Sequence, residues 1–248
     1  MANRLYKISI VVPSYKQEET IKKDVKRLTH ILTTLRMSFE IIVVVDGIFD
    51  STHKRVKSLK DNRVKIIRFK KNYGKGNAVK HGILQAKGDI IGFIDAGMDL
   101  DPKELETMLD IMENKKADIV IGSKLHPESR VNYPRIRKLL SWGYRSLTHL
   151  LFGFEIKDTQ VGMKLFKRKV AQEVFAKILV KRFAFDVEVL AVAYRFGYHR
   201  IYESPIHLNF TGISTITSRN FWKIIYWMLW DTAAVFYRLK IIHYYDKK

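Results

Sequence analysis

The sequence predicts an α/β fold whose core is a mostly parallel β-sheet with helices on both faces, and three observations indicate this class. Short apolar runs rich in β-branched residues recur along the chain. Segments with the apolar spacing of amphipathic helices separate these runs. The runs are apolar throughout instead of alternating with polar residues, which is typical of strands covered on both faces.

The expected strands and helices alternate over the first half of the chain. The strands are expected at residues 8–12, 39–45, 64–69, 90–94 and 117–121. The helices are expected at residues 18–36, 51–59, 76–86 and 102–113. The last of these begins with Pro102, because proline after Asp101 is favourable at a helix start.

The last third of the chain has a different pattern. Residues 134–152 are predicted to form a basic amphipathic helix, and residues 158–166 a polar loop that enters an apolar run. A short helix is expected at residues 186–196 and a strand at residues 199–210. Residues 220–244 are predicted to form one dense aromatic helix. Because no internal repeat or clear linker is visible, we expect one domain with a C-terminal extension.

The composition excludes several classes of protein. The 248 residues are 47% hydrophobic, which is too much for a wholly disordered chain, and they include no Cys, which excludes disulfide scaffolds, Cys-type zinc fingers and thiol catalysis. The N-terminal apolar run is too short for a signal peptide, and no apolar stretch is long enough to predict a membrane-spanning helix. The net charge of +20 predicts a polyanionic partner, which is a nucleic acid, a phosphorylated ligand or an anionic membrane.

Carboxylates follow two of the expected strands. Asp46 ends the second strand, Asp95 ends the fourth, and Asp99 lies four residues further on. Ligands of such sheets bind beyond the carboxyl ends of the strands, so these side chains are expected to face one crevice. They suit Mg²⁺ or Mn²⁺, which in turn neutralises a diphosphate. The alternative is that such aspartates cap helices and turns, and we favour it for Asp50 and Asp101.

The segment NYGKGNAVKHG at residues 72–82 resembles a phosphate-binding turn. Gly74 and Gly76 allow a close approach of the backbone, and Lys75 supplies positive charge. The segment is not a dinucleotide fingerprint, since Val79 stands where the last glycine belongs, and it is not a P-loop. The alternative is a glycine-rich entry to a helix, without a ligand.

Five segments together resemble the successive motifs of family 2 glycosyltransferases, which have the Rossmann-like GT-A fold. They read IVVPSYKQEETI, VVVDGIFDST, NYGKGNAVKHGI, IIGFIDAGMDLDP and IVIGSK. Two more segments, DTQVGMKLFKR and FAFDVEVL, resemble the polyprenyl-phosphate (dolichyl-phosphate) hexosyltransferases. Among these the dolichyl-phosphate glucosyltransferase branch is the most similar, with mannose synthases as near relatives.

The resemblance implies a reaction and its partners. It implies the inverting transfer of one hexose, glucose or alternatively mannose, from a nucleotide sugar to a polyprenyl phosphate. The donor would be UDP-glucose or GDP-mannose, and the cofactor Mg²⁺ or Mn²⁺. The protein would lie on the cytoplasmic face of a membrane as a peripheral protein. The QxxRW motif of processive polysaccharide synthases is absent, which favours transfer of a single sugar.

The same resemblance implies roles for individual residues. The expected donor-binding residues are Pro13, Tyr15, Asp46, Lys75 and Gly76. The expected catalytic residues are Asp95, Asp158 and Gln160, and the expected metal ligands are Asp95 and Asp99. The expected acceptor-binding residues are Ser123, Lys124, Arg135, Arg137 and Lys138.

The chain departs from the family pattern at three points. The usual D-x-D metal motif reads DAG at residues 95–97, so the second carboxylate is missing and we expect Asp99 to take over coordination. After Tyr15, KQ replaces the usual NE, and after Asp46, GI replaces the common GS. The change after Tyr15 concerns the recognition of the nucleoside base.

Basic residues gather on the expected acceptor side. Residues 124–145 hold one acidic residue, Glu128, and the basic residues Lys124, Arg130, Arg135, Arg137, Lys138 and Arg145. Arginine can bind a phosphate through two N–H groups, and two multiply charged phosphates must meet in the reaction. We therefore expect the cluster to bind the acceptor and membrane headgroups, although each residue alone is typical of a solvated surface.

The chain is expected to divide into a GT-A domain, residues 1–218, and a membrane-associating helix, residues 219–248. Charges within residues 221–245 make a bilayer-spanning helix costly. The segment is also rich in Trp and Tyr, which favour the membrane interface, and residues 219–248 carry a net charge of +4. The alternative is a core helix packed on the sheet or in a dimer interface.

Three other functions stay open at this point. The same fold could transfer a sugar to a non-lipid acceptor, the chain could be a basic nucleic-acid-binding protein, or it could be an inactive relative that binds membranes. The Lys residues are scattered over all elements and no nucleic-acid-reading motif is present, so nucleic acid is not an expected partner. Metal-dependent binding of a nucleotide sugar would separate the enzyme from the nucleic-acid-binding protein.

Overall fold

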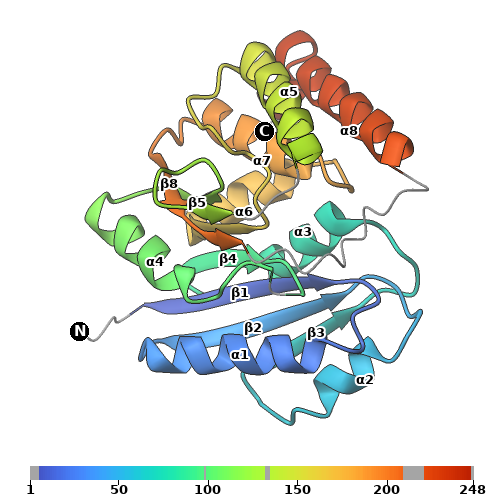
Figure 1. The fold of residues 1–248 in the computed structure, drawn as a ribbon, viewed down its shortest axis with the longest axis vertical. Coiled ribbons are helices and arrows are strands. Elements are labelled where there is room, and N and C mark those ends of the chain that lie inside the picture. Colours follow the sequence, from blue (N-terminus) through green and yellow to red (C-terminus); the bar gives the residue numbers. More distant parts are fainter. Residues whose placement is uncertain (1–5, 98, 132–134, 209–220, 247–248) are drawn as a thin grey trace.

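The computed structural model describes residues 6–97, 99–131, 135–208 and 221–246, and a seven-stranded sheet runs through it. Its strands are β1 (Lys7–Ser14), β2 (Ser38–Val45), β3 (Val64–Arg68), β4 (Ile90–Ile94), β5 (Ile119–Ser123), β7 (Met163–Lys167) and β8 (Ile201–Pro205). They lie in the order β3-β2-β1-β4-β7-β5-β8 (Figure 1). All neighbouring pairs are parallel except the two that contain β7. The predicted mostly parallel sheet is confirmed.

Helices cover both faces of the sheet, as the apolar strands predict. The helices are α1 (Ile21–Thr34), α2 (Thr52–Lys57), α3 (Lys75–Gln85), α4 (Glu104–Asn114), α5 (Arg135–Phe152), α6 (Arg168–Lys177), α7 (Phe185–Arg195) and α8 (Phe221–Phe236). The apolar residues of α1, α2 and α4 pack on one face, and those of α3, α6 and α7 pack on the other. Burial of both faces explains why the strands contain so few polar residues.

Several boundaries differ from the sequence-based expectation. The strand expected at residues 199–210 is two strands, β8 and β9 (His207–Leu208), and the helix expected at residues 220–244 ends at Phe236. Helix α4 begins at Glu104 and not at Pro102, because residues 101–103 form a turn in which the Glu104 N–H donates to the Asp101 carbonyl at 3.1 Å. The expected loop at residues 158–166 ends early, since β7 begins at Met163, and α6, which was not predicted, follows directly. Strand β7 begins directly after Gly162, and it was not predicted because its first residues continue a polar loop and include Lys164.

The antiparallel direction of β7 shapes the functional edge of the sheet. Asp46, Asp95 and Lys124 follow the carboxyl ends of β2, β4 and β5. Because β7 runs the opposite way, its first residue, Met163, pairs with Ile94 at that same edge. The loop before β7 therefore meets the ends of the parallel strands.

The C-terminal segment is anchored at its far end. Helix α8 lies beside α5, and the Tyr144 hydroxyl and Thr232 Oγ1 are 2.7 Å apart between them (Figure 1). After α8, a π-helical turn, η2 (Tyr237–Ile241), and a 3₁₀ turn, η3 (Tyr244–Asp246), return the chain to the core. There the buried Tyr245 hydroxyl donates to Glu188 Oε1 at 2.5 Å. Residues beyond α8 thus stabilise the domain itself.

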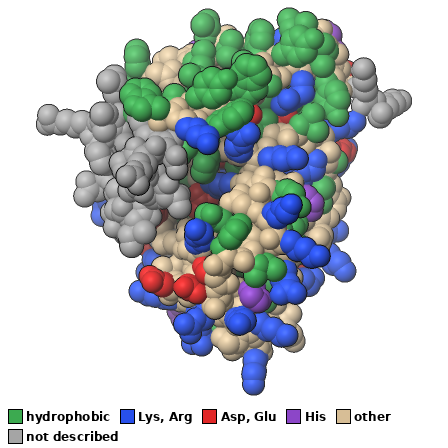
Figure 2. Space-filling model, turned by 90° about the vertical axis from the view of Figure 1, so that its right-hand side faces the viewer, with side chains coloured by type: hydrophobic (Ala, Val, Ile, Leu, Met, Phe, Trp, Pro, Cys, Tyr) green, Lys and Arg blue, Asp and Glu red, His purple; other side chains and the backbone are tan. Residues whose placement is uncertain are grey.

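The outer sides of α5 and α8 form an exposed apolar surface. Its largest exposed side chains, here called the α5–α8 apolar surface, are Trp142, Leu150, Trp222, Tyr226 and Trp230. Figure 2 shows hydrophobic side chains gathered at this end of the molecule and Lys and Arg spread over the rest of the visible face. A contiguous exposed apolar patch of this kind is typical of an interaction surface.

Candidate active site

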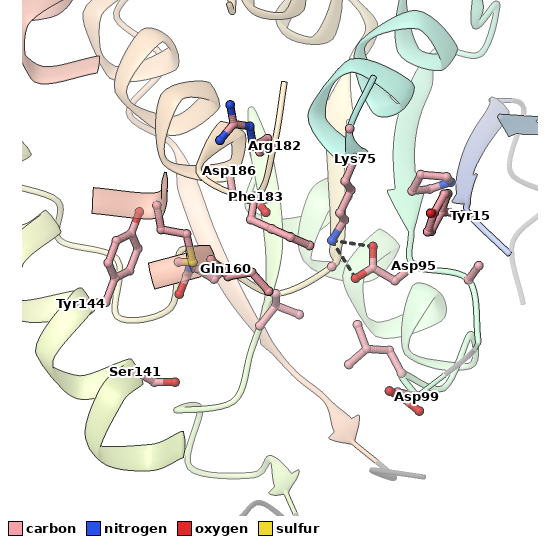
Figure 3. Close-up of a pocket in the computed structure, with 18 of the residues that line it drawn as sticks. Tyr15, Lys75, Asp95, Asp99, Ser141, Tyr144, Gln160, Arg182, Phe183 and Asp186 are labelled. Carbon is pink, nitrogen blue, oxygen red and sulfur yellow. Dashed lines mark hydrogen bonds and ion pairs between the residues drawn. The ribbon is translucent and has the colours of Figure 1, made fainter. Parts of the chain in front are cut away.

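A cavity of about 1010 Å³ lies at the carboxyl edge of the sheet and extends to α5 and α8. Its sheet side is lined by Pro13, Tyr15, Asp46, Gly74, Lys75, Asp95, Asp99, Lys124 and Gln160. Its other wall is mostly apolar and includes Leu140, Leu147, Ile224, Met228 and Leu229. Figure 3 shows Lys75 and Asp95 facing each other, with Tyr15 beyond Asp95 and with Tyr144 on the opposite side. The cavity therefore joins a polar floor to an apolar wall.

Asp95 and Lys75 form the central ion pair of the cavity. The Lys75 ammonium lies 2.7 Å from Asp95 Oδ1 and 2.8 Å from Oδ2. The Asp95 N–H donates to the Gly162 carbonyl at 2.9 Å, and a Cβ on Gly162 would overlap the Asp95 carboxylate. Glycine is thus required before β7 so that the carboxylate fits. The Asp95 side chain is 40% exposed and faces the cavity.

Asp46 lines the cavity, but its oxygens are already bonded. Its carboxylate accepts the backbone N–H groups of Tyr73 and Gly74, both at 2.8 Å, and the residue is 3% exposed. It therefore fixes the turn that precedes α3. Gly74 has φ +100° in this turn, which favours glycine. The turn places Lys75 at the first position of α3, aimed at Asp95.

A second, buried ion pair joins Lys164 to Asp186, which also lines the cavity. Lys164 on β7 donates to the Asp186 carboxylate at 2.5 Å and to the Val161 carbonyl at 2.7 Å. The Lys164 side chain is 0% exposed. Burial lowers the pKa of Lys164 and raises that of Asp186, although each partner opposes the shift. Burial would also lower the pKa of Lys75, but the charges of Asp95 and Asp186 outweigh it and raise that pKa.

The loop after β4 carries the expected metal residues. Gly97 has φ +90°, and its N–H donates to the buried Asp24 carboxylate at 3.0 Å, so the loop is held by α1. Asp99 lines the cavity below Asp95 (Figure 3). No group of three His, Cys, Asp or Glu side chains placed to hold a metal occurs among the described residues.

The residues nonetheless fit a divalent cation held jointly with a ligand. Both oxygens of Asp95 already contact one cation, the Lys75 ammonium. Mg²⁺ commonly uses one or two protein carboxylates together with phosphate oxygens and water. Asp95 and Asp99 are the residues that could supply those carboxylates.

Asp158 and Lys124 are bonded to each other at the edge of the cavity. The buried Asp158 carboxylate accepts the Lys124 N–H at 3.0 Å and lies 3.3 Å from its ammonium. Its other oxygen accepts the Gln160 N–H at 3.3 Å, which sets the loop that presents Gln160 to the cavity. Ser123 is fully buried, and its hydroxyl accepts the Leu125 N–H at 3.2 Å. Of the expected catalytic and acceptor residues at this edge, Lys124 and Gln160 reach the cavity.

Three expected acceptor residues, Arg135, Arg137 and Lys138, begin α5, but their side chains lie outside the described residues. Sequence reasoning missed other residues that the loop between α6 and α7 brings to the cavity. Arg182 lines it, with its guanidinium carbon 3.8 Å from the centre of the Trp227 ring on α8. Phe183 and Asp186 come from the same segment. A lysine inside the apolar run MKLF, at position 164, was the available signal for the buried pair.

Comparisons with known proteins agree with this geometry. The profile described as "Glycosyl transferase family 2" matches residues 9–175. A dolichyl-phosphate beta-glucosyltransferase of Dictyostelium discoideum is 34% identical over 201 residues, which cover 75% of this chain and 62% of that protein. The human protein of the same name is 32% identical over 252 residues, covering 95% of this chain and 76% of its own length. The sequence-based resemblance is thereby confirmed.

Solved structures share the fold at low identity. Glucosyl-3-phosphoglycerate synthase from Mycobacterium tuberculosis, solved with Mn²⁺, uridine diphosphate and phosphoglyceric acid, superposes with a TM-score of 0.68 at 17% identity, covering 94% of this chain and 78% of that one. Mannosyl-3-phosphoglycerate synthase from Rubrobacter xylanophilus gives a TM-score of 0.69 at 18% identity, covering 95% and 75%. The predicted GT-A-like fold is confirmed by this likeness.

Proposed function

Because the chain belongs to glycosyl transferase family 2, we propose that it transfers one hexose from a nucleoside-diphosphate sugar to a polyprenyl phosphate of the dolichyl type. Glucose from UDP-glucose is the favoured sugar, and mannose from GDP-mannose is the alternative. The names of the relatives at 30–34% identity support the glucose assignment and the lipid acceptor. The chain spans 62% of the Dictyostelium relative and 76% of the human one, so this proposal concerns the part they share.

One observation carries the proposal: the same cavity that holds the strand-edge residues Lys75 and Asp95 opens toward the apolar walls of α5 and α8. A nucleotide sugar needs cations and hydrogen-bonding groups, which the sheet side supplies. A polyprenyl chain needs apolar surface next to the reacting phosphate, and the helix side supplies it. A cavity for two water-soluble substrates would not need an apolar wall of this size.

The chemistry asks for alignment and charge stabilisation. An acceptor phosphate oxygen forms a bond to the anomeric carbon while the bond from that carbon to the nucleoside diphosphate breaks, which inverts the anomeric centre. A phosphate monoester is mostly ionised at pH 7, so it needs little help from a general base. Lys75 and Arg182, which both line the cavity, supply positive charge, and Gln160 supplies a neutral hydrogen-bonding side chain.

The proposed cofactor is a divalent cation, Mg²⁺ or Mn²⁺, held by Asp95 and Asp99. When bound, it would neutralise the charge that develops on the departing diphosphate. The Mn²⁺ in the mycobacterial glucosyl-3-phosphoglycerate synthase supports this assignment. The contact of both Asp95 oxygens with an ammonium group supports the same position from this chain's own geometry.

We place the reaction at the cytoplasmic surface of a membrane. Within the described part of the chain, no helix combines the length and hydropathy that a bilayer crossing requires. The α5–α8 apolar surface holds three Trp and a Tyr, which favour the depth of lipid headgroups. The cavity opens beside this surface, so a polyprenyl phosphate could reach Lys75 without leaving the interface.

A direct test offers the protein a panel of nucleotide sugars and two acceptors. UDP-glucose, UDP-galactose and GDP-mannose are each supplied with Mg²⁺ or Mn²⁺, together with polyprenyl phosphate in vesicles or with 3-phosphoglycerate in water. Mass spectrometry of the lipid phase should show a hexosyl phosphoryl polyprenol with UDP-glucose, and less or none with the others. Transfer to 3-phosphoglycerate alone, or no transfer to lipid with any donor, would contradict the proposal.

A further inference from the structure

Four charged side chains form an alternating series that starts in the core and ends in the cavity. Lys164 is fully buried and pairs with Asp186 at 2.5 Å. The Asp186 carboxylate in turn acts on Lys75, whose ammonium holds both oxygens of Asp95. The order of charges is plus, minus, plus, minus, and Asp186, Lys75 and Asp95 line the cavity. Lys75 can therefore pair with either of two carboxylates, Asp95 or Asp186.

The buried pair is not explained by stability. Removing a lysine and a carboxylate from water costs several kcal/mol per ion, and replacing such a pair with apolar groups is often neutral or stabilising. Lys164 stands among apolar neighbours, with its ammonium 5.3 Å from the centre of the Phe93 ring. A methionine would fill the same space without the desolvation cost. A functional role that requires the charge of Asp186 would explain why the pair is present.

The outer pair has a conflict of its own. Asp95 is the strand-end carboxylate that fits a divalent cation, yet a lysine ammonium contacts both of its oxygens. A metal ion on either oxygen would compete with this ammonium for the carboxylate and repel its positive charge. Lys75 must leave when a metal arrives, and an ammonium that loses its partner inside a cavity needs another counter-charge.

We propose that Lys75 occupies the cation position on Asp95 in the empty enzyme, and that Asp186, anchored by Lys164, is the positioning residue that receives Lys75 when a divalent cation and the donor enter. Asp186 lines the same cavity as Lys75 (Figure 3), and its charge favours the charged form of Lys75. Lys164 prevents Asp186 from becoming a buried unpaired carboxylate. This inference rests on the proposed use of a metal-bound nucleotide-sugar donor.

The exchange has a functional consequence. With Lys75 on Asp95, the empty enzyme has no exposed, unpaired carboxylate at that position, so stray divalent cations bind weakly. A cation that arrives with a diphosphate brings negative charge that also attracts the displaced Lys75. Metal and nucleotide should therefore bind cooperatively, and the lysine is the reason.

The first test measures Mn²⁺ binding without nucleotide, by the electron paramagnetic resonance signal of free Mn²⁺. Lys75→Met should tighten Mn²⁺ binding about fivefold or more, since the competing ammonium is gone. Lys80→Met is the matched control: Lys80 lies on the same helix but bonds the carbonyls of Ala176 and Ile178, and its loss should leave Mn²⁺ affinity unchanged. Unchanged or weaker Mn²⁺ binding by Lys75→Met, or none that can be measured, overturns the inference.

The second test concerns Asp186 and uses calorimetric binding of uridine diphosphate during a Mn²⁺ titration. The double variant Lys164→Met/Asp186→Asn removes the buried pair at constant size. It should fold and should raise the half-saturating Mn²⁺ concentration about tenfold, because Lys75 has lost its second partner. In a Lys75→Met background the same double substitution should change that concentration by less than about twofold. A merely structural pair predicts a change in melting temperature and no effect on Mn²⁺ dependence, which overturns the role of Asp186.

A further control uses a buried carboxylate far from the cavity. The outcomes below also distinguish a failure of this inference from a failure of the proposed function. Glu40→Gln/Lys65→Met removes an ion pair of 2.6 Å at the other edge of the sheet and should leave Mn²⁺ dependence unchanged. If the double variant at positions 164 and 186 does not fold, the Lys75→Met result still decides the exchange. If the enzyme binds Mn²⁺ and uridine diphosphate in this pattern but transfers no sugar to lipid, the proposed acceptor is wrong and the exchange stands.

Discussion

The two ends of the central strands carry carboxylates in opposite situations. Glu40, near the start of β2, accepts hydrogen bonds from Ser9 Oγ at 2.7 Å, from the Lys87 N–H at 2.7 Å and from Lys65 Nζ at 2.6 Å. Burial would raise the pKa of Glu40, but these donors outweigh it and lower the pKa to about 2. Asp95, at the other end, faces a cavity, and its ion-pair partner, Lys75, lines the same cavity.

The difference separates carboxylates that stabilise the fold from those that can take part in binding or catalysis. Glu40 is buried and accepts three hydrogen bonds, from one backbone N–H and two side chains, so its charge stabilises the native state. Asp95 keeps its charge accessible and relies on a partner that can be displaced. Charged side chains that pair with each other while facing a cavity are typical of functional sites.

The largest expected effect comes from a substitution at the carboxyl ends of the strands, where Asp95 faces the cavity. Asp95→Asn should reduce hexose transfer about a thousandfold or more while the melting temperature stays within a few degrees, since Asn keeps the shape and the cavity tolerates the change. The measurement is kcat/KM for transfer together with thermal unfolding. Asp101→Asn in the same loop, whose carboxylate pairs with Arg27 at 2.9 Å, is the control and should retain most activity. Substantial transfer by Asp95→Asn would remove Asp95 from the mechanism.

The next effect concerns Glu40, at the other end of the strands, and is a loss of stability that depends on pH. Because the pKa of Glu40 falls from 4.5 to about 2 on folding, its charge contributes stability above pH 4.5 that is lost as the pH falls toward 2. Glu40→Gln should therefore lower the free energy of unfolding by about 3 kcal/mol at pH 7, and the difference should shrink between pH 4.5 and 2. Urea unfolding at several pH values measures it. A difference that does not vary with pH would show that the charge of Glu40 is not responsible.

A third experiment tests whether the α5–α8 apolar surface, beside the cavity, binds membranes. The triple variant Trp222→Ala/Tyr226→Ala/Trp230→Ala should weaken binding to anionic vesicles about thirtyfold and leave uridine diphosphate binding intact, because these side chains are exposed and form no part of the core. Vesicle sedimentation at low and high salt measures it. Point substitutions are preferable to removing residues 219–248, since Val235 and Tyr245 belong to the core. Equal vesicle binding by the triple variant would favour the alternative that α8 is a packing helix only.

The smallest effect decides to which group Asp158 belongs. It lies at the functional edge, as Asp95 does, but its oxygens are bonded much as those of Glu40 are. If it orients Gln160 and Lys124 for the reaction, Asp158→Asn should lower kcat about tenfold with donor KM nearly unchanged. Steady-state kinetics and thermal unfolding separate the outcomes. A fall in melting temperature with normal kcat would assign Asp158 to the fold.

Most of the architecture could be predicted because buried parallel strands have a strong signal. The runs around Val12, Val43 and Phe93 are apolar on both faces, and turn residues punctuate them. Strand β7 was missed because it begins within a polar loop and contains Lys164, and a lysine in a strand normally indicates solvent. Helix α6 was missed because it follows β7 without any breaking residue.

The candidate site was predictable in position but not in its pairings. Strand-end logic brings Asp46, Asp95 and Lys75 to one cavity, and the structure does so. The sequence could not show that the Asp46 oxygens bond the Tyr73–Gly74 turn, since that depends on side-chain direction. Arg182 could not be predicted because it lies in a loop and its partner, Trp227, is 45 residues away on α8.

The antiparallel strand β7 also dictates when the molecule can be completed during synthesis. Until residue 167 has left the ribosome, β4 is the edge of the sheet, and its sequence IIGFI is wholly apolar. Strand β5 cannot join earlier, since its link to the sheet passes through β7. An apolar edge of this kind is a template for pairing with other chains. A stalled ribosome, or an expression fragment cut near residue 131, would therefore release a polypeptide prone to aggregation.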